Sequence, residues 1–308
     1  MDKFLKDCLY FLLIFILVII SSNSFFSWFQ NMYSNFELNE KPKYLMLGHS
    51  HSACAYNDTI ISDFINLSDL GESYFYTFVK LKKILEQNQS IETIFLEYSN
   101  NQLNKVMDEW IWGYEKMNYR YPKYSSYMNV KEHMVLFRNN PIYFIMSFSR
   151  SLRYKLEFFL FNSSKNISSI GGFKPNKNNI KKEDFEKHRH NKIEVESENI
   201  SKKNIEYLMK IIDYCKDNNL KIVLLRSPTL ISYNNHIEYN RLLKNELSDI
   251  DYFDFKKFPL KHIHFSDGQH LNVKGAKLIS EWFESSLTKD FIKNLKQKKT
   301  IQKEIESW

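Results

Sequence analysis

The sequence KYLMLGHSHSACAYND spans residues 43–58 and joins a short apolar run to a polar turn. The apolar part, residues 43–48, is typical of a buried strand that ends at a glycine. Two histidines and two serines follow within the next four residues. The turn is therefore a nucleophile turn, a metal clip or an ordinary polar loop, and the rest of the sequence decides among the three.

Strand and helix patterns alternate outward from this stretch. The runs DFINLS (63–68) and ETIFLEYS (92–99) flank a segment with apolar residues at helical spacing, SYFYTFVKLKKILEQN (73–88). After residue 200 the alternation resumes, with apolar runs LKIVLLRSP and DIDYFDF set between amphipathic helix patterns. This order predicts an α/β fold of three layers, in which helices cover both faces of a central parallel sheet.

The alternation breaks between residues 106 and 199. Residues 106–161 are crowded with Tyr, Trp, Phe and Met and predict a mostly helical insertion after the third strand, and the Ser-, Asn- and Lys-rich remainder predicts a long mobile loop. The expected organisation is an N-terminal transmembrane anchor or signal segment (1–30), a linker (31–42), an α/β domain (43–105 and 200–290), the aromatic insertion with its loop (106–199) and a basic C-terminal tail (291–308).

The first 30 residues predict the compartment. The apolar run CLYFLLIFILVII (8–20) follows two lysines, and no charged residue occurs from its start until Glu37. Continued to Phe29, the segment reaches the roughly 20 residues that a transmembrane helix needs. The alternative is a cleaved signal peptide whose cleavage site lies at residues 22–24. Both place the rest of the chain outside the cytoplasm, in the periplasm or at the cell surface.

Composition argues against several classes of function. The net charge of +7 is spread along the chain without a compact basic-aromatic motif, so nucleic acid is not an expected partner. No glycine-rich phosphate loop occurs, which argues against nucleotide-dependent chemistry. The three cysteines are too scattered for a disulfide framework or a zinc cluster, although a bridge between Cys54 and Cys215 stays open. The sequence predicts no cofactor.

Polar clusters follow the predicted strands, where ligands bind in open α/β sheets. They contain Ser50, Gly71, Asn100 and Asn101, and, before the last helix, Asp267 and His270. A carboxylate and an imidazole three residues apart can share one turn, so that the acid holds the tautomer of the ring while its other nitrogen faces a nucleophile. Ser50 is the serine that the order of strands and helices brings to this pair.

These residues resemble the SGNH, or GDSL-like, hydrolases. In that family four blocks supply a serine, a glycine, an asparagine and a terminal D-x-x-H pair, which correspond here to Ser50, Gly71, Asn100 or Asn101, and Asp267 with His270. The resemblance covers about residues 43–105 and 203–287, and DGQHLNVKGA (267–276) is its most specific part. The sequence departs from the family at His49, which replaces an aspartate, and at residues 98–101, which replace Gly-x-Asn-Asp.

The resemblance implies a flavodoxin-like sheet and a serine esterase or O-acyltransferase. Ser50 would be the nucleophile and His270 the base held by Asp267, while the oxyanion hole would use the N–H groups of Ser50 and Gly71 with the amide of Asn100 or Asn101. With these departures, the sequence is more similar to the membrane-anchored members of the family. Those proteins act on cell-surface glycans, often beside a membrane-bound acyltransferase. The implied substrates are an acyl donor with a glycan acceptor, or an acylated glycan, and acetyl is the expected acyl group.

Other interpretations remain beside this one. Ser50 and Ser52 could simply cap the following helix. The pairs His49/His51 and His262/His264 have spacing that suits metal ligands, although no carboxylate or cysteine stands close to the first pair in the sequence, and no metal is expected. The chain could also be a non-catalytic glycan-binding or assembly protein that keeps the same scaffold.

Overall fold

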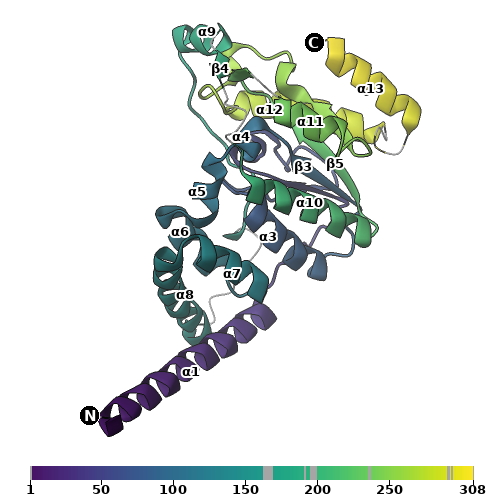
Figure 1. Ribbon diagram of the computed structural model, residues 1–308. Coiled ribbons are helices and arrows are strands. Elements are labelled where there is room, and N and C mark those ends of the chain that lie inside the picture. Colours follow the sequence, from purple (N-terminus) through teal and green to yellow (C-terminus); the bar gives the residue numbers. More distant parts are fainter. Residues whose placement is uncertain are drawn as a thin grey trace. The chain divides into compact units, whose positions relative to one another are not determined.

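The computed structural model describes residues 2–161, 169–190, 192–194, 200–234, 237–289, 292 and 294–307. The chain forms two compact units, each considered by itself. The helical unit comprises residues 1–36 and 111–166, and the sheet unit comprises residues 37–110 and 167–308 (Figure 1).

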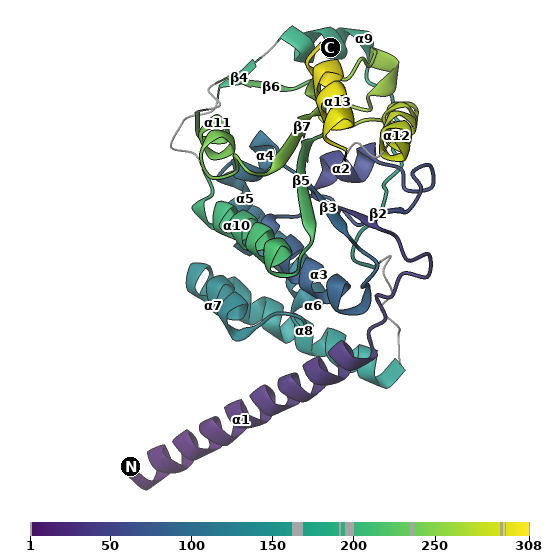
Figure 2. The same cartoon turned by 90° about the vertical axis from the view of Figure 1, so that its right-hand side faces the viewer.

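The sheet unit is built on five parallel strands. In sheet order these are β2 (Phe64–Asn66), β1 (Tyr44–Leu47), β3 (Thr93–Glu97), β5 (Lys221–Arg226) and β7 (Asp251–Asp254) (Figure 2). Numbered within the sheet alone, the order is 2-1-3-4-5, which is the flavodoxin-like arrangement. The prediction of an α/β fold with a central parallel sheet is confirmed.

Helices cover both faces of this sheet because alternate strand residues point to opposite sides. Helix α3 (Tyr74–Gln87) packs against α10 (Lys202–Asp217) on one side. On the other side, strand residues such as Met46, Phe95 and Val223 join one buried cluster with Ile279 and Phe283 of α12 (Val273–Thr288). Figure 2 shows α12 and α13 (Leu295–Ser307) across the sheet from α3 and α10.

Shorter elements connect these layers. They are α2 (Ser50–Ala55), α4 (Asn100–Leu103), α5 (Val106–Trp112), α9 (Lys182–His190), α11 (Ile237–Lys244), the 3-10 turns η2 (Phe255–Lys257) and η3 (His262–His264), and a separate parallel pair, β4 (Lys192–Glu194) with β6 (Ser232–Asn234). The strand ends and the short helices α2 and α4 that follow them bring the polar clusters of the sequence to one edge of the sheet.

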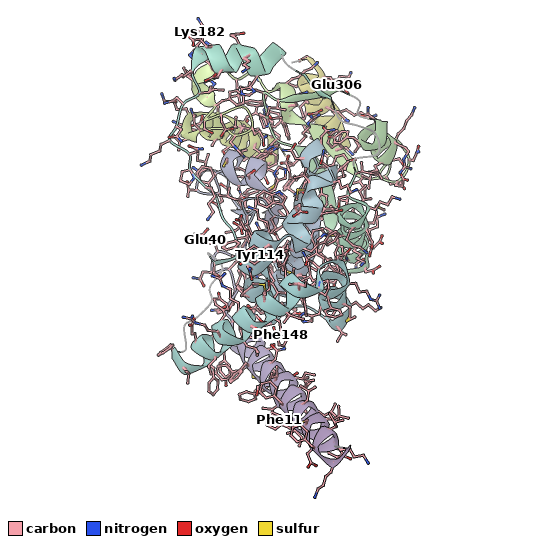
Figure 3. The ribbon with its side chains drawn as sticks, turned by 60° about the vertical axis from the view of Figure 1, so that its left-hand side comes forward. Phe11, Glu40, Tyr114, Phe148, Lys182 and Glu306 are labelled. Carbon is pink, nitrogen blue, oxygen red and sulfur yellow. The ribbon has the colours of Figure 1, made fainter. Side chains whose placement is uncertain are left out.

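The helical unit contains α1 (Asp2–Tyr33), α6 (Tyr114–Tyr124), α7 (Val130–Asn139) and α8 (Pro141–Phe161), and α8 packs against the other three. Residues 3–33 of α1 are long and apolar enough to cross a membrane, with a mean hydropathy of 2.4 in their most apolar window. None of that window is buried, and Figure 3 shows side chains such as Phe11 projecting outward. The predicted N-terminal apolar helix is thus present.

Two segments differ from the predicted organisation. Residues 169–190, expected in a mobile loop of the insertion, belong to the sheet unit, because Ile180 and Phe185 are buried in its core cluster. Residues 162–168, 191 and 195–199 of that expected loop lie outside the described residues.

The C-terminal tail, expected to be a basic segment outside the α/β domain, also contributes to the core. Ile301 and Ile305 lie four residues apart on one face of α13 and are buried in the same cluster, and Lys298 beside them pairs with Asp251 of β7. Cys54 and Cys215 are free thiols, so the bridge between them is not formed.

Candidate active site

Ser50 is the first residue of α2, directly after β1 and a tight turn. The turn needs glycine at position 48, because a Cβ there would lie 2.4 Å from Ser52 Oγ and 2.5 Å from Glu97 Cβ. This close approach to the end of β3 sets Ser50 at the carboxyl edge of the sheet, where its side chain lines a cavity.

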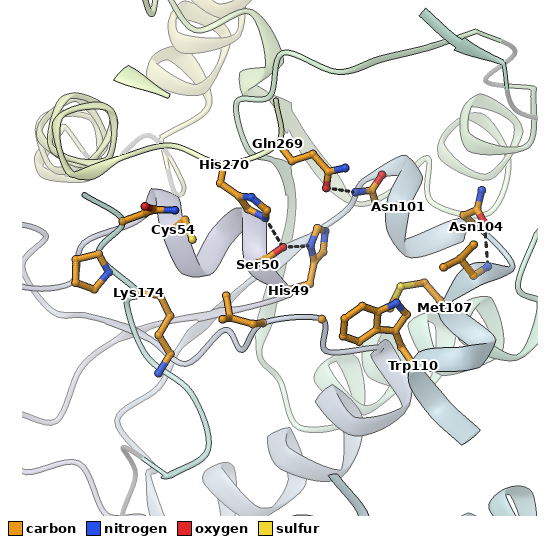
Figure 4. Close-up of a pocket in the computed structure, with 15 residues that line it drawn as sticks. His49, Ser50, Cys54, Asn101, Asn104, Met107, Trp110, Lys174, Gln269 and His270 are labelled. Atoms are coloured by element: carbon orange, nitrogen blue, oxygen red, sulfur yellow. Dashed lines mark hydrogen bonds between the residues drawn. The ribbon is translucent and has the colours of Figure 1, made fainter. Parts of the chain in front are cut away.

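Ser50, His270 and Asp267 form a continuous hydrogen-bonded chain. The distance between Ser50 Oγ and His270 Nε2 is 2.8 Å, although the two residues are 220 positions apart (Figure 4). His270 Nδ1 lies 3.0 Å from each carboxylate oxygen of Asp267. With the Nδ1 proton directed at the carboxylate, Nε2 is left as an acceptor for the Ser50 hydroxyl, which is the arrangement of a serine nucleophile and its base.

The loop that carries this acid and base is held from both sides. The main chains of Phe265 and Leu271 form an antiparallel bridge across it, and Ser266 N–H donates to the His270 carbonyl. Asn272 caps α12 through its side-chain oxygen and donates its amide to the Ile263 carbonyl at 2.8 Å. The asparagine of the D-x-x-H-L-N motif therefore fixes the loop to the helix that follows.

The Asp267 side chain is set up as a carboxylate. Partial burial alone would raise its pKa, but hydrogen bonds from the His270 ring and from the Gln269 and His270 N–H groups lower the pKa to about 2. The carboxylate therefore stays ionised and oriented toward the ring throughout the neutral pH range.

Gly71 lies on the loop after β2 and lines the same cavity. Its φ of +64° is strained for other residues, and a Cβ would overlap the Trp110 ring at 1.8 Å. Among the described residues, the N–H groups of Ser50 and Gly71 donate to no other group, so both remain available as donors.

The structure separates the two candidate asparagines. Asn101 lines the cavity, and its Nδ2 lies 3.4 Å from Gln269 Oε1 and 3.3 Å from His51 Nε2. The side-chain oxygen of Asn100 instead accepts a hydrogen bond from Arg226, and Asn100 does not line the cavity. Of the two, Asn101 is the residue that stands beside Ser50 and His270.

His49 and His51 are buried next to the triad. His49 Nδ1 accepts from the His51 N–H and lies 3.5 Å from Ser50 Oγ, so its Nε2 carries the proton that faces Ser99 Oγ at 2.9 Å. Burial, reinforced by the charge of nearby His270, lowers the pKa of His49 to about 3, and burial lowers the pKa of His51 well below its usual value. Both rings are therefore neutral at physiological pH.

Glu97 lies beneath this cluster and was not singled out from the sequence. Its carboxylate accepts hydrogen bonds from the backbone and the hydroxyl of Ser227, while burial raises its pKa to about 7. His49, His51 and Glu97 are the described group whose ligand atoms, within 4.8 Å of one another, could hold a metal ion. Two of these residues already have hydrogen-bond partners, His49 with Ser99 and Glu97 with Ser227.

The cavity at the triad has a volume of about 740 Å³ and lies within the sheet unit. Its lining includes the apolar side chains of Leu70, Met107 and Trp110, and also Lys174, Pro175 and Asn176. Figure 4 shows Met107 and Trp110 on one side of Ser50 and Lys174 on the other. Sequence reasoning missed residues 174–176, because nothing in their composition separates them from the polar segment around them. Trp110 was not singled out either, because it lies in a stretch rich in aromatic residues.

Comparison with known proteins adds little to this description. A family model matches residues 174–292, and its description names no activity. No curated protein matches the chain. A crystal structure from Bacteroides fragilis, described as a "putative acylhydrolase", is similar over 85% of this chain and 93% of that chain, with 9% identity and a TM-score of 0.39. At that level the likeness carries no argument about function, which has to come from the site itself.

Proposed function

We propose that the protein is an extracytoplasmic serine esterase or O-acyltransferase that acts on acyl esters of a cell-surface or exported polysaccharide. The observation that carries the proposal is the 2.8 Å contact between Ser50 Oγ and His270 Nε2, with Asp267 on the far nitrogen of the ring. A serine hydroxyl becomes a useful nucleophile only when a base takes its proton, and this geometry supplies that base.

The reaction proceeds in two halves. Ser50 Oγ attacks the ester carbonyl carbon, and the proton of the Ser50 hydroxyl passes to His270 Nε2. When the tetrahedral intermediate collapses, the bond between the acyl carbon and the alcohol oxygen breaks, and the leaving alcohol takes that proton. A water molecule or a sugar hydroxyl then attacks the acyl-Ser50, giving its proton to His270, and Ser50 leaves with that proton restored. Hydrolysis and transfer differ only in this second nucleophile.

The developing oxyanion needs fixed donors. The N–H groups of Ser50 and Gly71 are free to donate, and Asn101 supplies a side-chain amide that lines the same cavity. Removing one such donor typically costs about 10²–10³ in rate. We assign this role to Asn101 and not to Asn100, because the latter is bound to Arg226 away from the cavity.

Two features support a glycan as substrate. The cavity, at about 740 Å³, is far larger than an acetyl group and leaves room for a sugar beside the ester. Its Trp110 ring offers an aromatic surface of the kind on which sugar rings pack. Anchoring by α1 would keep the enzyme at the membrane from which such polysaccharides are exported, where a membrane-bound acyltransferase is the proposed partner.

The test is covalent labelling of the full chain in detergent. We expect a fluorophosphonate to label Ser50, and a short aryl ester to release its chromophore; Ser50→Ala should abolish both, whereas Ser62→Ala, at an exposed serine of the same unit, should change neither. Equal turnover by Ser50→Ala would refute the nucleophile assignment. Product analysis with an added sugar acceptor then separates hydrolysis from transfer.

The non-catalytic alternative predicts a different result. It would be favoured by a serine and histidine too far apart for a hydrogen bond, beyond about 4 Å, which is not the observed geometry. It remains testable, because such a protein would bind acylated glycan without being labelled at Ser50.

A further inference from the structure

Helix α8 has one face that is packed within its unit and another that is apolar and exposed. Ser147, Ser151, Lys155 and Phe158 are buried against the rest of the helical unit. Another face carries an outward stripe with gaps of three or four residues, namely Ile142, Ile145, Leu152 and Leu156, with Ser149 completing the pattern. The stripe ends at Phe159, which packs against α1. Ile142 is 69% exposed and Ile145 is 58% exposed, so the stripe is open along the first half of the helix.

The stripe continues an apolar surface that α1 begins. The Phe159 ring packs against Phe25, Phe26 and Phe29 of α1, with centroid distances of 4.8–5.7 Å. The two helices are thus in direct contact within one unit, and the stripe of α8 leads along the helix to this contact.

The same contact accounts for polar residues in α1. Residues 21–24 interrupt its apolar run, and Asn23 Oδ1 accepts a hydrogen bond of 2.8 Å from Lys155 Nζ on the buried face of α8. Both polar groups are therefore satisfied inside the unit and not directed at lipid. Cleavage of α1 at residues 22–24 would remove this acceptor and leave the Lys155 ammonium buried without it.

We propose that α8 lies in the lipid–water interface of the bilayer that α1 enters, with the stripe from Ile142 to Leu156 in the lipid. A helix of this kind is amphipathic, lies in the plane of the membrane and buries its apolar face about 5–10 Å into the headgroup boundary. Arg153, which adjoins the stripe on the side of Ile142 and Ser149 and pairs with Glu157, is placed to meet lipid phosphates. The inference rests on the proposed anchoring by α1 but not on the proposed esterase activity.

The occupant of the stripe is the lipid and not a partner protein, because the stripe ends at the contact with α1, whose most apolar window is entirely exposed. An interface for a soluble partner would not need to adjoin such a helix. The proposal also separates α8 from the catalytic cavity, which is lined by residues of the sheet unit alone.

Fluorophore depth measurement in liposomes tests this inference. Full-length protein with Cys8→Ser, in which the remaining cysteines are buried, receives single cysteines at Ile145, Leu156 or Ser149 on the stripe. Ser149→Cys exchanges a small exposed residue and guards against misfolding of the larger changes. Arg150→Cys on another face of α8 is the matched control, and Phe15→Cys reports on α1. Each site carries an environment-sensitive label, in vesicles of phosphatidylcholine and phosphatidylglycerol.

We expect nitroxides near the lipid headgroup to quench the stripe labels at least about twofold more strongly than the Arg150 label, and deep nitroxides to quench the Phe15 label. Iodide in the buffer quenches labels that are exposed to water. If the Phe15 label is quenched by deep nitroxides but iodide quenches the stripe labels as strongly as the Arg150 label, the inference is overturned and the anchor is left intact. Absence of quenching at both α1 and the stripe would overturn the anchor as well. Neither result depends on fluorophosphonate labelling of Ser50.

Discussion

At the scale of single residues, His49 is one of the positions at which this sequence departs from the family that it resembles. Where an aspartate is expected, the chain has an imidazole that caps α2, contacts Ser50 and donates to Ser99. A neutral ring can fill this position because it leaves no net charge beside the nucleophile. The folded state loses stability at low pH, because burial opposes protonation of the imidazole.

The stability of the protein should therefore fall as the pH is lowered below about 6.5. Unfolded His49 binds a proton near its ordinary pKa of 6.5, whereas folded His49 does so only near pH 3, so in this window the unfolded state holds more protons and stability rises with pH. Urea unfolding measured at pH 7.5 and at pH 4.5 gives the loss of unfolding free energy between the two. This loss should be about 2–3 kcal/mol larger for the wild type than for His49→Asn. His262→Asn is the control, and parallel losses in all three would contradict the assignment.

At the scale of elements, the loop that carries Gly71 is held by a buried ion pair. Lys80 Nζ of α3 lies 2.7 Å from Glu72 Oε1, both side chains are fully buried, and the ammonium also donates to the carbonyls of Leu67 and Ile170. One side chain thus ties the end of β2, the Gly71 loop and the segment that leads to the cavity wall at Lys174. Its role is to position the Gly71 donor and that wall.

Replacing Lys80 should destabilise the sheet unit strongly. Lys80→Met leaves the Glu72 carboxylate buried without its counterion, which typically costs about 3–5 kcal/mol. Lys83→Met is the matched control on the same helix, because Glu86, the partner of Lys83, is more than half exposed, and such a pair contributes at most about 1 kcal/mol. The midpoints of urea unfolding measure the stability of both variants. If Lys80→Met loses as little stability as Lys83→Met, the Lys80–Glu72 pair is dispensable for folding.

At the scale of the whole molecule, sequence segments far apart complete each unit. Residues 169–190 and α13 join the core of the sheet unit, and α1 packs with α8 in the helical unit. Tails and insertions of polar composition thus became structural parts, because a few well-spaced apolar residues are enough to bury one face of a helix.

The contribution of α13 can be measured directly. Ile301→Ala removes a side chain that is 4% exposed in the core cluster and should cost about 2–5 kcal/mol of unfolding free energy. Gln302→Ala, at the exposed neighbouring position, should stay within about 0.5 kcal/mol of wild type. If both variants unfold at the wild-type denaturant concentration, α13 is not part of the folded core.

The sequence by itself determined the order of strands and helices, the parallel sheet and the apolar first helix, because these follow from local periodicity. It also predicted that Ser50 follows the first strand and that Asp267 and His270 lie just before the helix that starts at Val273. Tertiary structure alone decided that Asn101 and not Asn100 enters the cavity, that Lys174 to Asn176 form its wall, and that α8 belongs with α1. The physical reason is that side-chain direction at a strand end and contacts between distant segments depend on packing across the fold, which no local pattern records.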